Sequence, residues 1–127
     1  MIIGIGTDII EISRIAESIE RLGDRFLNRI LTKPEQDQYF RLSGHRAISF
    51  VAKRFAAKEA AVKALGTGIG AGVSFQHFTV SNLDSGKPIL EVADSISQLV
   101  GQHAIWHLSL SDEKQYALAF VTLETKE

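Results

Sequence analysis

Apolar residues in the first part of the chain change from a strand-like to a helical pattern. Residues 2–7 are β-branched and contain two glycines, which is typical of a short buried strand that runs to Asp8. Through residues 9–22, apolar side chains recur three or four positions apart, with charged side chains between them. The pattern therefore predicts a strand followed directly by an amphipathic helix.

Three further helical segments follow. The apolar pattern continues over residues 26–31, and Thr32, Pro34 and Glu35 supply a helix start for a short helix that reaches Leu42. Residues 47–65 are rich in alanine and contain no glycine or proline, which predicts a long helix. This helix should end at the glycine-rich segment 66–72.

The last part of the chain alternates between strand and turn signals. Residues 75–83 and 89–92 flank a Gly-Lys-Pro turn and predict one hairpin, and residues 104–110 and 116–123 predict a second. Between them, Asp94 can cap a short helix that reaches about Val100. Helices and antiparallel strands in separate stretches indicate the α+β class.

Length and composition are those of an ordinary globular domain. We expect the 127 residues to form a single domain, 1–127, because the chain is 45% hydrophobic and 23% charged. A domain of this size still exposes much of its surface, so a second copy of the chain could cover an apolar sheet face. Oligomerisation is therefore compatible with the sequence.

Charge and cysteine content exclude several classes of function. The formal net charge of −1 provides no global attraction to nucleic acid or to an anionic membrane, so neither is expected as a partner. Without cysteine, disulfides, zinc–thiolate sites and cysteine nucleophiles are excluded. There is no basic, apolar leader and no run of about 20 apolar residues, so we expect a cytoplasmic protein.

Asp8 is the first candidate for chemistry. A carboxylate at the end of a strand can be held rigidly and can coordinate a hard cation through oxygen. The same residue precedes the predicted helix, and Glu11 three positions later gives a capping-box spacing. A metal ligand and a helix cap are both open for Asp8 at this point.

The long helix carries the second group of candidates. At 3.6 residues per turn, Arg54 and Lys58 share one ridge, and Glu59 and Lys63 share the next. The helix could present three cations beside one carboxylate to a ligand. Alternatively, it could be a solvated face with an ordinary Glu59–Lys63 ion pair.

The glycines and histidines match no standard motif. Residues 66–72 lack the Gly-Lys-Ser/Thr ending of a P-loop, and Ile9 replaces the third glycine of a dinucleotide-binding fingerprint. The glycine segment can expose backbone amides to a phosphate or simply end the helix. The four histidines lack the spacing of a helical zinc pair, and no nucleophile elbow surrounds a serine, so a zinc site and a serine hydrolase are disfavoured.

Two segments taken together resemble the signature motifs of the phosphopantetheinyl transferases. These are Ile-Gly-Thr-Asp at residues 5–8 and Arg-Phe-Ala-Ala-Lys-Glu-Ala-Ala-Val-Lys-Ala at residues 54–64. The glycine segment 66–70, the turn 86–88 and the segment 109–119 extend the resemblance over essentially the whole chain. In length the chain is similar to the short bacterial type of this family, the holo-acyl-carrier-protein synthases.

The resemblance implies a fold and a reaction. The fold would be α+β, with a small antiparallel sheet and a long central helix, assembled as a homotrimer with active sites between subunits. The reaction would be the magnesium-dependent transfer of 4′-phosphopantetheine from coenzyme A to a serine of apo acyl carrier protein, in support of fatty acid biosynthesis. The other product would be adenosine 3′,5′-bisphosphate.

The resemblance also implies roles for individual residues. Magnesium would be bound by Asp8 and Glu59, and the serine proton would go either to Glu59, which we favour, or to a metal-bound hydroxide. The cofactor phosphates would meet the side chains of His45, Arg46, Arg54, Lys58 and Lys63 and the backbone of Gly66 and Gly68. Lys63 would also be catalytic.

A basic face for the acidic carrier protein would complete the site. Arg14, Arg21, Arg25 and Arg29 lie in or beside the first helix and resemble the docking face of the family, although ordinary solvated arginines are an alternative. Two rival functions are a noncatalytic coenzyme A or nucleotide-binding module and a carrier-protein interaction domain without chemistry.

Overall fold

A computed structural model of the chain describes residues 1–101 and 103–126, and it confirms the α+β class. The elements follow in the order β1 (Ile2–Glu11), α1 (Ile12–Leu22), α2 (Asp24–Ile30), α3 (Lys33–Tyr39), α4 (Gly44–Leu65), a 3-10 turn (Phe75–His77), β2 (Phe78–Asn82), β3 (Pro88–Val92), α5 (Asp94–Val100), β4 (Ala104–Asp112) and β5 (Tyr116–Thr125).

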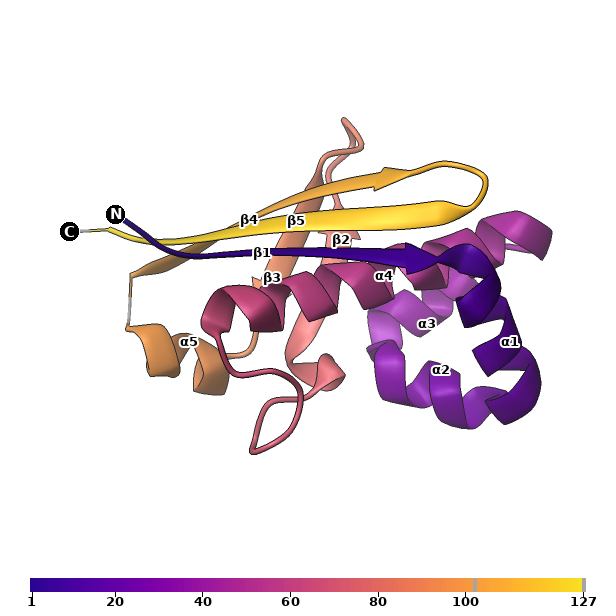
Figure 1. Ribbon diagram of the computed structural model, residues 1–127, viewed down its shortest axis with the longest axis horizontal. Helices are drawn as coiled ribbons and strands as arrows, with labels where there is room; N and C mark the ends of the chain where they lie inside the picture. Colours follow the sequence, from indigo (N-terminus) through magenta and orange to yellow (C-terminus); the bar gives the residue numbers. More distant parts are fainter. Residues whose placement is uncertain (102, 127) are drawn as a thin grey trace.

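A three-stranded antiparallel sheet and the long helix α4 form the centre of the fold. The strand order is β1-β5-β4, and α4 lies across one face of this sheet (Figure 1). β1 and β5 run side by side along their whole length, so the two chain ends meet at one edge of the molecule. Both predicted hairpins, β2–β3 and β4–β5, are confirmed.

β1 is longer than the sequence pattern predicts. It continues through Asp8 to Glu11, and α1 begins only at Ile12 because Asp8, Ile9 and Ile10 remain paired with β5. Asp8 therefore lies within a strand and cannot cap a helix. Asp94 likewise is the first residue of α5 and not its cap, since Ala93 occupies the cap position.

The helices α1, α2 and α3 pack together at one end of α4 (Figure 1). Thr32 and Glu35 form a capping box at the start of α3, which confirms the predicted helix start. Gly23, with φ +57°, separates α1 from α2, so the segment after it is a helix of its own. Apolar side chains of α1 and α2, including Ile15, Leu27 and Ile30, are buried against α4.

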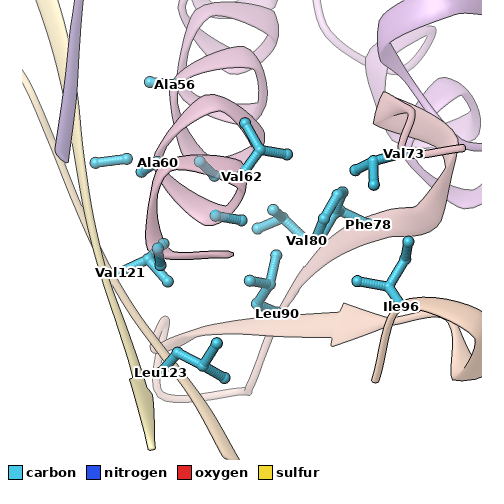
Figure 2. Packing of buried hydrophobic residues seen from close by; sticks show 14 residues of the cluster. Ala56, Ala60, Val62, Val73, Phe78, Val80, Leu90, Ile96, Val121 and Leu123 are labelled. Atoms are coloured by element: carbon cyan, nitrogen blue, oxygen red, sulfur yellow. The ribbon is translucent and has the colours of Figure 1, made fainter. Parts of the chain in front are cut away.

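The β2–β3 hairpin forms a two-stranded sheet of its own and packs on the same side of the main sheet as α4. Figure 2 shows where the three layers meet: Ala60 and Val62 from α4, Val121 and Leu123 from β5, and Phe78, Val80 and Leu90 from the hairpin. This cluster holds the hairpin against the helix, and the two together frame the cavity described below.

The other face of the main sheet is apolar and exposed. Outward positions of β1 and β5 carry the side chains of Ile3, Ile5, Ile9, Leu118 and Phe120. Ile9 pairs directly with Leu118, so these side chains form one continuous patch. Among the residues that the structure describes, no helix is long and apolar enough to cross a membrane.

Candidate functional site

Two glycines of β1 bring the strand unusually close to α4. Gly4, Gly6 and Asp8 alternate along the strand and point to the same face. A Cβ atom at Gly4 would lie 2.0 Å from the carbonyl oxygen of Ala64, and one at Gly6 would lie 2.0 Å from that of Ala60. Only glycine fits at both positions, and the alanines below are small for the same reason. This close contact carries Asp8 towards the helix.

Asp8 and Glu59 form a pair of half-buried carboxylates. Burial raises the pKa of Glu59, and the nearby charge of Asp8 raises it further. Burial also raises the pKa of Asp8, although the hydrogen bond and charge of Lys63 partly offset it. The two carboxylates repel each other, and Lys63 offsets this repulsion only in part. A cation bound between them is therefore favoured.

Lys63 is bonded to β1 and not to Glu59. Its Nζ donates to the carbonyl oxygen of Thr7 at 2.9 Å and lies 3.3 Å from Asp8 Oδ1. The ordinary Glu59–Lys63 surface ion pair is thus replaced by an ion pair between helix and strand. Asp8 Oδ2 is buried and has no hydrogen-bond partner.

The carboxylate pair fits a magnesium ion. Magnesium prefers oxygen ligands and typically binds through one or two carboxylates, completing its shell with water and substrate phosphates. Asp8 and Glu59 supply two such ligands, and Asp8 Oδ2 is an acceptor with no other use. No third metal-ligating side chain joins them within residues 1–101 and 103–126, which leaves room for phosphate oxygens.

A cavity of about 620 Å³ lies between the first half of α4, the β2–β3 hairpin and the end of β4. Its lining contains the predicted residues His45, Arg46 and Arg54. Two further cations, Arg41 and Lys53, also line it, so the cavity is strongly basic. An anionic ligand of nucleotide size suits this charge and volume.

Arg54 is the buried member of this basic set. Its side chain is only 3% exposed, its guanidinium stacks 4.0 Å from the centroid of the Phe50 ring, and Nη2 donates to Asn82 Oδ1 at 3.1 Å. Burial lowers the pKa of Arg54 to about 10, which leaves it charged at neutral pH. Its Nε is buried without a hydrogen-bond partner. A buried, incompletely bonded guanidinium in a basic cavity is a strong anion ligand.

One acidic side chain, that of Asp112, lies among the basic residues that line the cavity. Asp112 Oδ2 accepts a hydrogen bond from Ser49 at 3.1 Å, and Asp112 Oδ1 lies 3.5 Å from Lys53 Nζ. Sequence reasoning missed four residues, which come from the turn after α3, from α4, from β2 and from β4: Arg41, Lys53, Asn82 and Asp112. Only their proximity in the fold identifies them.

The structure does not place Lys58 where the sequence predicted it. We expected a cation beside the cofactor phosphates, but the side chain is fully buried and donates to Glu35 Oε1 and to the carbonyl oxygen of Ile30, both at 2.6 Å. Lys58 lies one turn after Arg54, and its ammonium group points towards α2 and α3. In this structure its charge is neutralised inside the protein.

The carboxylate pair and the basic cavity lie on different sides of α4. Glu59 follows Arg54 by five positions, which corresponds to a rotation of about 140° around a helix. Glu59 faces the β1 side, whereas Arg54 faces the β2–β3 hairpin. One copy of the chain therefore presents the two halves of the candidate site in different directions.

The glycine segment begins as a helix stop. Gly66 adopts a left-handed conformation, and its N–H donates to the carbonyl oxygens of Val62 and Lys63. That amide is used within the chain, while Gly68 is exposed in the loop that follows. Contact between this loop and a cofactor stays a prediction.

The four arginines of the predicted docking face are all exposed. Arg14 and Arg21 lie on α1, and Arg25 and Arg29 lie on α2. Arg29 sits 5.7 Å above the centroid of the Phe75 ring and also contributes positive charge near Glu59. The basic face thus borders the carboxylate pair.

Comparison with known proteins identifies the family of the chain. The sequence model of the 4′-phosphopantetheinyl transferase superfamily matches residues 4–121. A holo-[acyl-carrier-protein] synthase from Marinomonas sp. is 65% identical over 99% of this chain and 100% of its own length. One from Shewanella frigidimarina is 52% identical over 98% of both chains.

Two solved structures show the same fold. The holo-(acyl-carrier-protein) synthase of Bacillus anthracis, in complex with CoA (3′,5′-ADP), is 48% identical over 99% of both chains, with a TM-score of 0.85. The enzyme from Neisseria meningitidis is 38% identical, covers 98% of this chain and all of its own, and has a TM-score of 0.89. The chain therefore belongs to the 4′-phosphopantetheinyl transferase superfamily and, within it, to the family of the holo-[acyl-carrier-protein] synthases.

Proposed function

We propose that this protein transfers the 4′-phosphopantetheine group of coenzyme A to a serine of apo acyl carrier protein, in support of fatty acid biosynthesis. The products are holo acyl carrier protein and adenosine 3′,5′-bisphosphate. The observation that carries the proposal is the buried, unpartnered Oδ2 of Asp8 beside Glu59, in a chain 65% identical to a holo-[acyl-carrier-protein] synthase. We expect the reaction to take place in the cytoplasm.

The attacking hydroxyl comes from the carrier protein. Its oxygen forms a bond to the phosphorus that carries pantetheine, the bond from that phosphorus to the bridging oxygen breaks, and the nucleotide leaves with the electron pair. The hydroxyl proton goes to a base, for which Glu59 is our candidate because burial and the charge of Asp8 both raise its pKa. Lys63, bonded to Asp8 and Thr7, is positioned to offset negative charge on the phosphates.

Asp8 and Glu59 are the proposed magnesium ligands. When bound, magnesium would neutralise charge that develops on the pyrophosphate oxygens. The fit rests on two half-buried carboxylates whose mutual repulsion a cation would relieve and on the free acceptor Asp8 Oδ2. Lys63 would keep Asp8 oriented towards the metal while leaving this second oxygen available.

The basic cavity is the proposed site of the nucleotide. Its volume of about 620 Å³ accommodates an adenosine, Arg46 and Arg54 supply charge for the 3′-phosphate, and the His45 ring lines the same cavity as a further ligand for it. Arg54 is the most important of the three, since it is buried and its Nε has no other partner. Removal of the 3′-phosphate from coenzyme A should therefore weaken binding strongly.

The working form is proposed to be a homotrimer. An exposed patch of five large apolar side chains on β1 and β5 would be covered by other copies of the chain. The opposite orientation of the carboxylate pair and the basic cavity supports the same assembly, because a second copy could bring its cavity to the first copy's carboxylates. The pyrophosphate would then lie between subunits.

A noncatalytic coenzyme A-binding module is the alternative from another class. It would need the basic cavity but would have no use for a half-buried carboxylate pair that two glycines of β1 bring together with α4. One experiment separates the two functions. Incubation with apo acyl carrier protein, coenzyme A and Mg²⁺ should add the mass of phosphopantetheine to the carrier protein; nucleotide binding without this mass gain would rule out the transferase.

A further inference from the structure

Glu35 is a fully buried carboxylate with every oxygen in use. Its side chain is 0% exposed. Oε1 accepts hydrogen bonds from the backbone N–H of Thr32 at 2.8 Å and from Lys58 Nζ at 2.6 Å, and Oε2 accepts one from the backbone N–H of Val80 at 2.8 Å. Such a complete set of donors makes the carboxylate position well defined.

The partners of Glu35 belong to separate parts of the fold. Thr32 caps α3, Lys58 lies in the middle of α4, and Val80 lies in β2. Lys58 also donates to the carbonyl oxygen of Ile30, the last residue of α2. A single carboxylate therefore ties the short helices, the long helix and the β2–β3 hairpin together at one point.

This point lies directly behind the basic cavity. The hairpin provides one wall through Asn82, Gly86 and Pro88, and α4 provides the opposite wall. Val80 is two residues from Asn82 on the same strand, and Lys58 is one helical turn from Arg54. The hydrogen bond from Arg54 to Asn82 then connects the two walls at the cavity itself.

Stability alone gives a weak reason for this ion pair. Removing two charges from water is costly, and replacing a buried ion pair by apolar residues is often neutral or stabilising. The pair contributes hydrogen bonds of defined direction. They fix the hairpin, which forms its own two-stranded sheet, at a set distance from α4. Apolar packing between Val80 and Val62 would tolerate small shifts that hydrogen bonds of this geometry would not.

We propose that Glu35 is a positioning residue: through Lys58 and Val80 it sets the spacing between α4 and the β2–β3 hairpin, and so the shape of the cavity that receives the nucleotide. The inference rests on the proposed function, because that function assigns the nucleotide to this cavity. It gives Lys58 a role through Glu35, in place of direct contact with the phosphates.

Glu35→Gln distinguishes an indirect role of Lys58, through Glu35, from direct contact with phosphate, because the two roles predict different changes in nucleotide affinity. The glutamine lacks the charge and presents an N–H group where only acceptors fit, so the hairpin loses its fixed place. If Glu35 positions the cavity, nucleotide binding should weaken at least tenfold. If Lys58 contacts phosphate directly, its release from Glu35 should leave binding unchanged or strengthen it.

The assay is calorimetric titration of the full-length protein with adenosine 3′,5′-bisphosphate in EDTA, so that only the cavity is probed. Lys33→Ala is the matched control, because it removes the exposed Lys33–Asp37 ion pair of the same helix α3 and should bind as the wild type does. Transfer kinetics of Glu35→Gln should show a raised KM for coenzyme A, with kcat and the KM for carrier protein within about threefold of wild type.

If Glu35→Gln fails to fold, the double variant Glu35→Met/Lys58→Met removes both charges together. It should unfold at a temperature close to that of the wild type and still bind the nucleotide at least tenfold more weakly. Wild-type affinity in a folded Glu35→Gln or in the double variant would overturn the inference alone. Absence of nucleotide binding by the wild type would instead contradict the proposed function.

Discussion

Adding one methyl group at Gly6 should separate the two carboxylates of the site. In Gly6→Ala the new Cβ would lie 2.0 Å from the carbonyl oxygen of Ala60, 2.9 Å from the backbone nitrogen of Ala64 and 3.0 Å from the carbonyl carbon of Ala60. These are backbone atoms of α4, so no side-chain rotation relieves the clash. Strand and helix must move apart instead.

The displacement can be estimated from the same contacts. Real Cβ atoms essentially never approach other atoms below 3.0 Å, so the helix and strand must separate by about 1 Å. Overpacking of this kind costs about 1–3 kcal/mol of stability. Because Asp8 lies two residues further along β1, the shift also moves it away from Glu59, and a misplacement of about 1 Å can reduce a rate by about 100-fold.

The transfer rate and the thermal unfolding temperature of Gly6→Ala should therefore both fall. The rate should fall far more than the loss of stability alone would cause. Ile96→Val is the matched control, since Ile96 is buried in α5 and its truncation costs about 0.5–1.5 kcal/mol without touching β1. Mass spectrometry of the carrier protein gives the rate. Near-wild-type transfer by Gly6→Ala, or an equal loss in Ile96→Val, would show that the close contact does not hold the site together.

Three other predictions concern charge, assembly and docking. Burial raises the pKa of Asp8 and Glu59, so on lowering the pH from neutral these groups should take up protons in the folded protein before they do in the unfolded chain. Metal-free wild type should therefore gain stability relative to Asp8→Asn as the pH falls. The stabilisation by magnesium should decrease over the same pH range. Thermal melts in EDTA and in Mg²⁺ across pH test this, and a pH-independent difference between the two proteins would refute it. Ile5→Arg places a charge in the exposed apolar patch and should dissociate the oligomer, with transfer lost in parallel, as measured by light scattering; an unchanged mass would remove the patch from the interface. Arg14→Ala should weaken carrier-protein affinity about two- to tenfold at low ionic strength and much less in high salt, since an exposed charge contributes little once screened; unchanged affinity would remove Arg14 from the docking face.

Local patterns predicted the elements well because their signals lie within a few residues. The alanine-rich run became α4, which starts at Gly44, three residues earlier than expected, and the two hairpins follow directly from their turns. The extent of β1 was missed, because its pairing with β5 joins residues more than a hundred positions apart. The helical spacing from Ile9 onwards therefore suggested a helix where a strand continues.

The carboxylate pair was named from resemblance, and one signal in the sequence supports it independently. Gly4, Gly6 and Asp8 fall on one face of a strand, and Ala60 and Ala64 fall one turn apart on a helix, which is a pattern for close strand–helix contact. The burial of Lys58 could not be predicted, since its partner Glu35 is 23 positions away and carries no local sign of burial. Charge on a helix does not by itself reveal which face meets water.

The dependence of transfer on magnesium tests the central assignment of Asp8 and Glu59 most directly. The rate of phosphopantetheine addition to apo acyl carrier protein should be measured across Mg²⁺ concentrations for wild type and Glu59→Gln, with nucleotide binding in EDTA measured on the same samples. The account predicts saturable activation of the wild type, no transfer in EDTA, and a loss of at least 100-fold in Glu59→Gln with nucleotide binding retained. Transfer by the wild type in EDTA, or by Glu59→Gln at the wild-type rate, would contradict it.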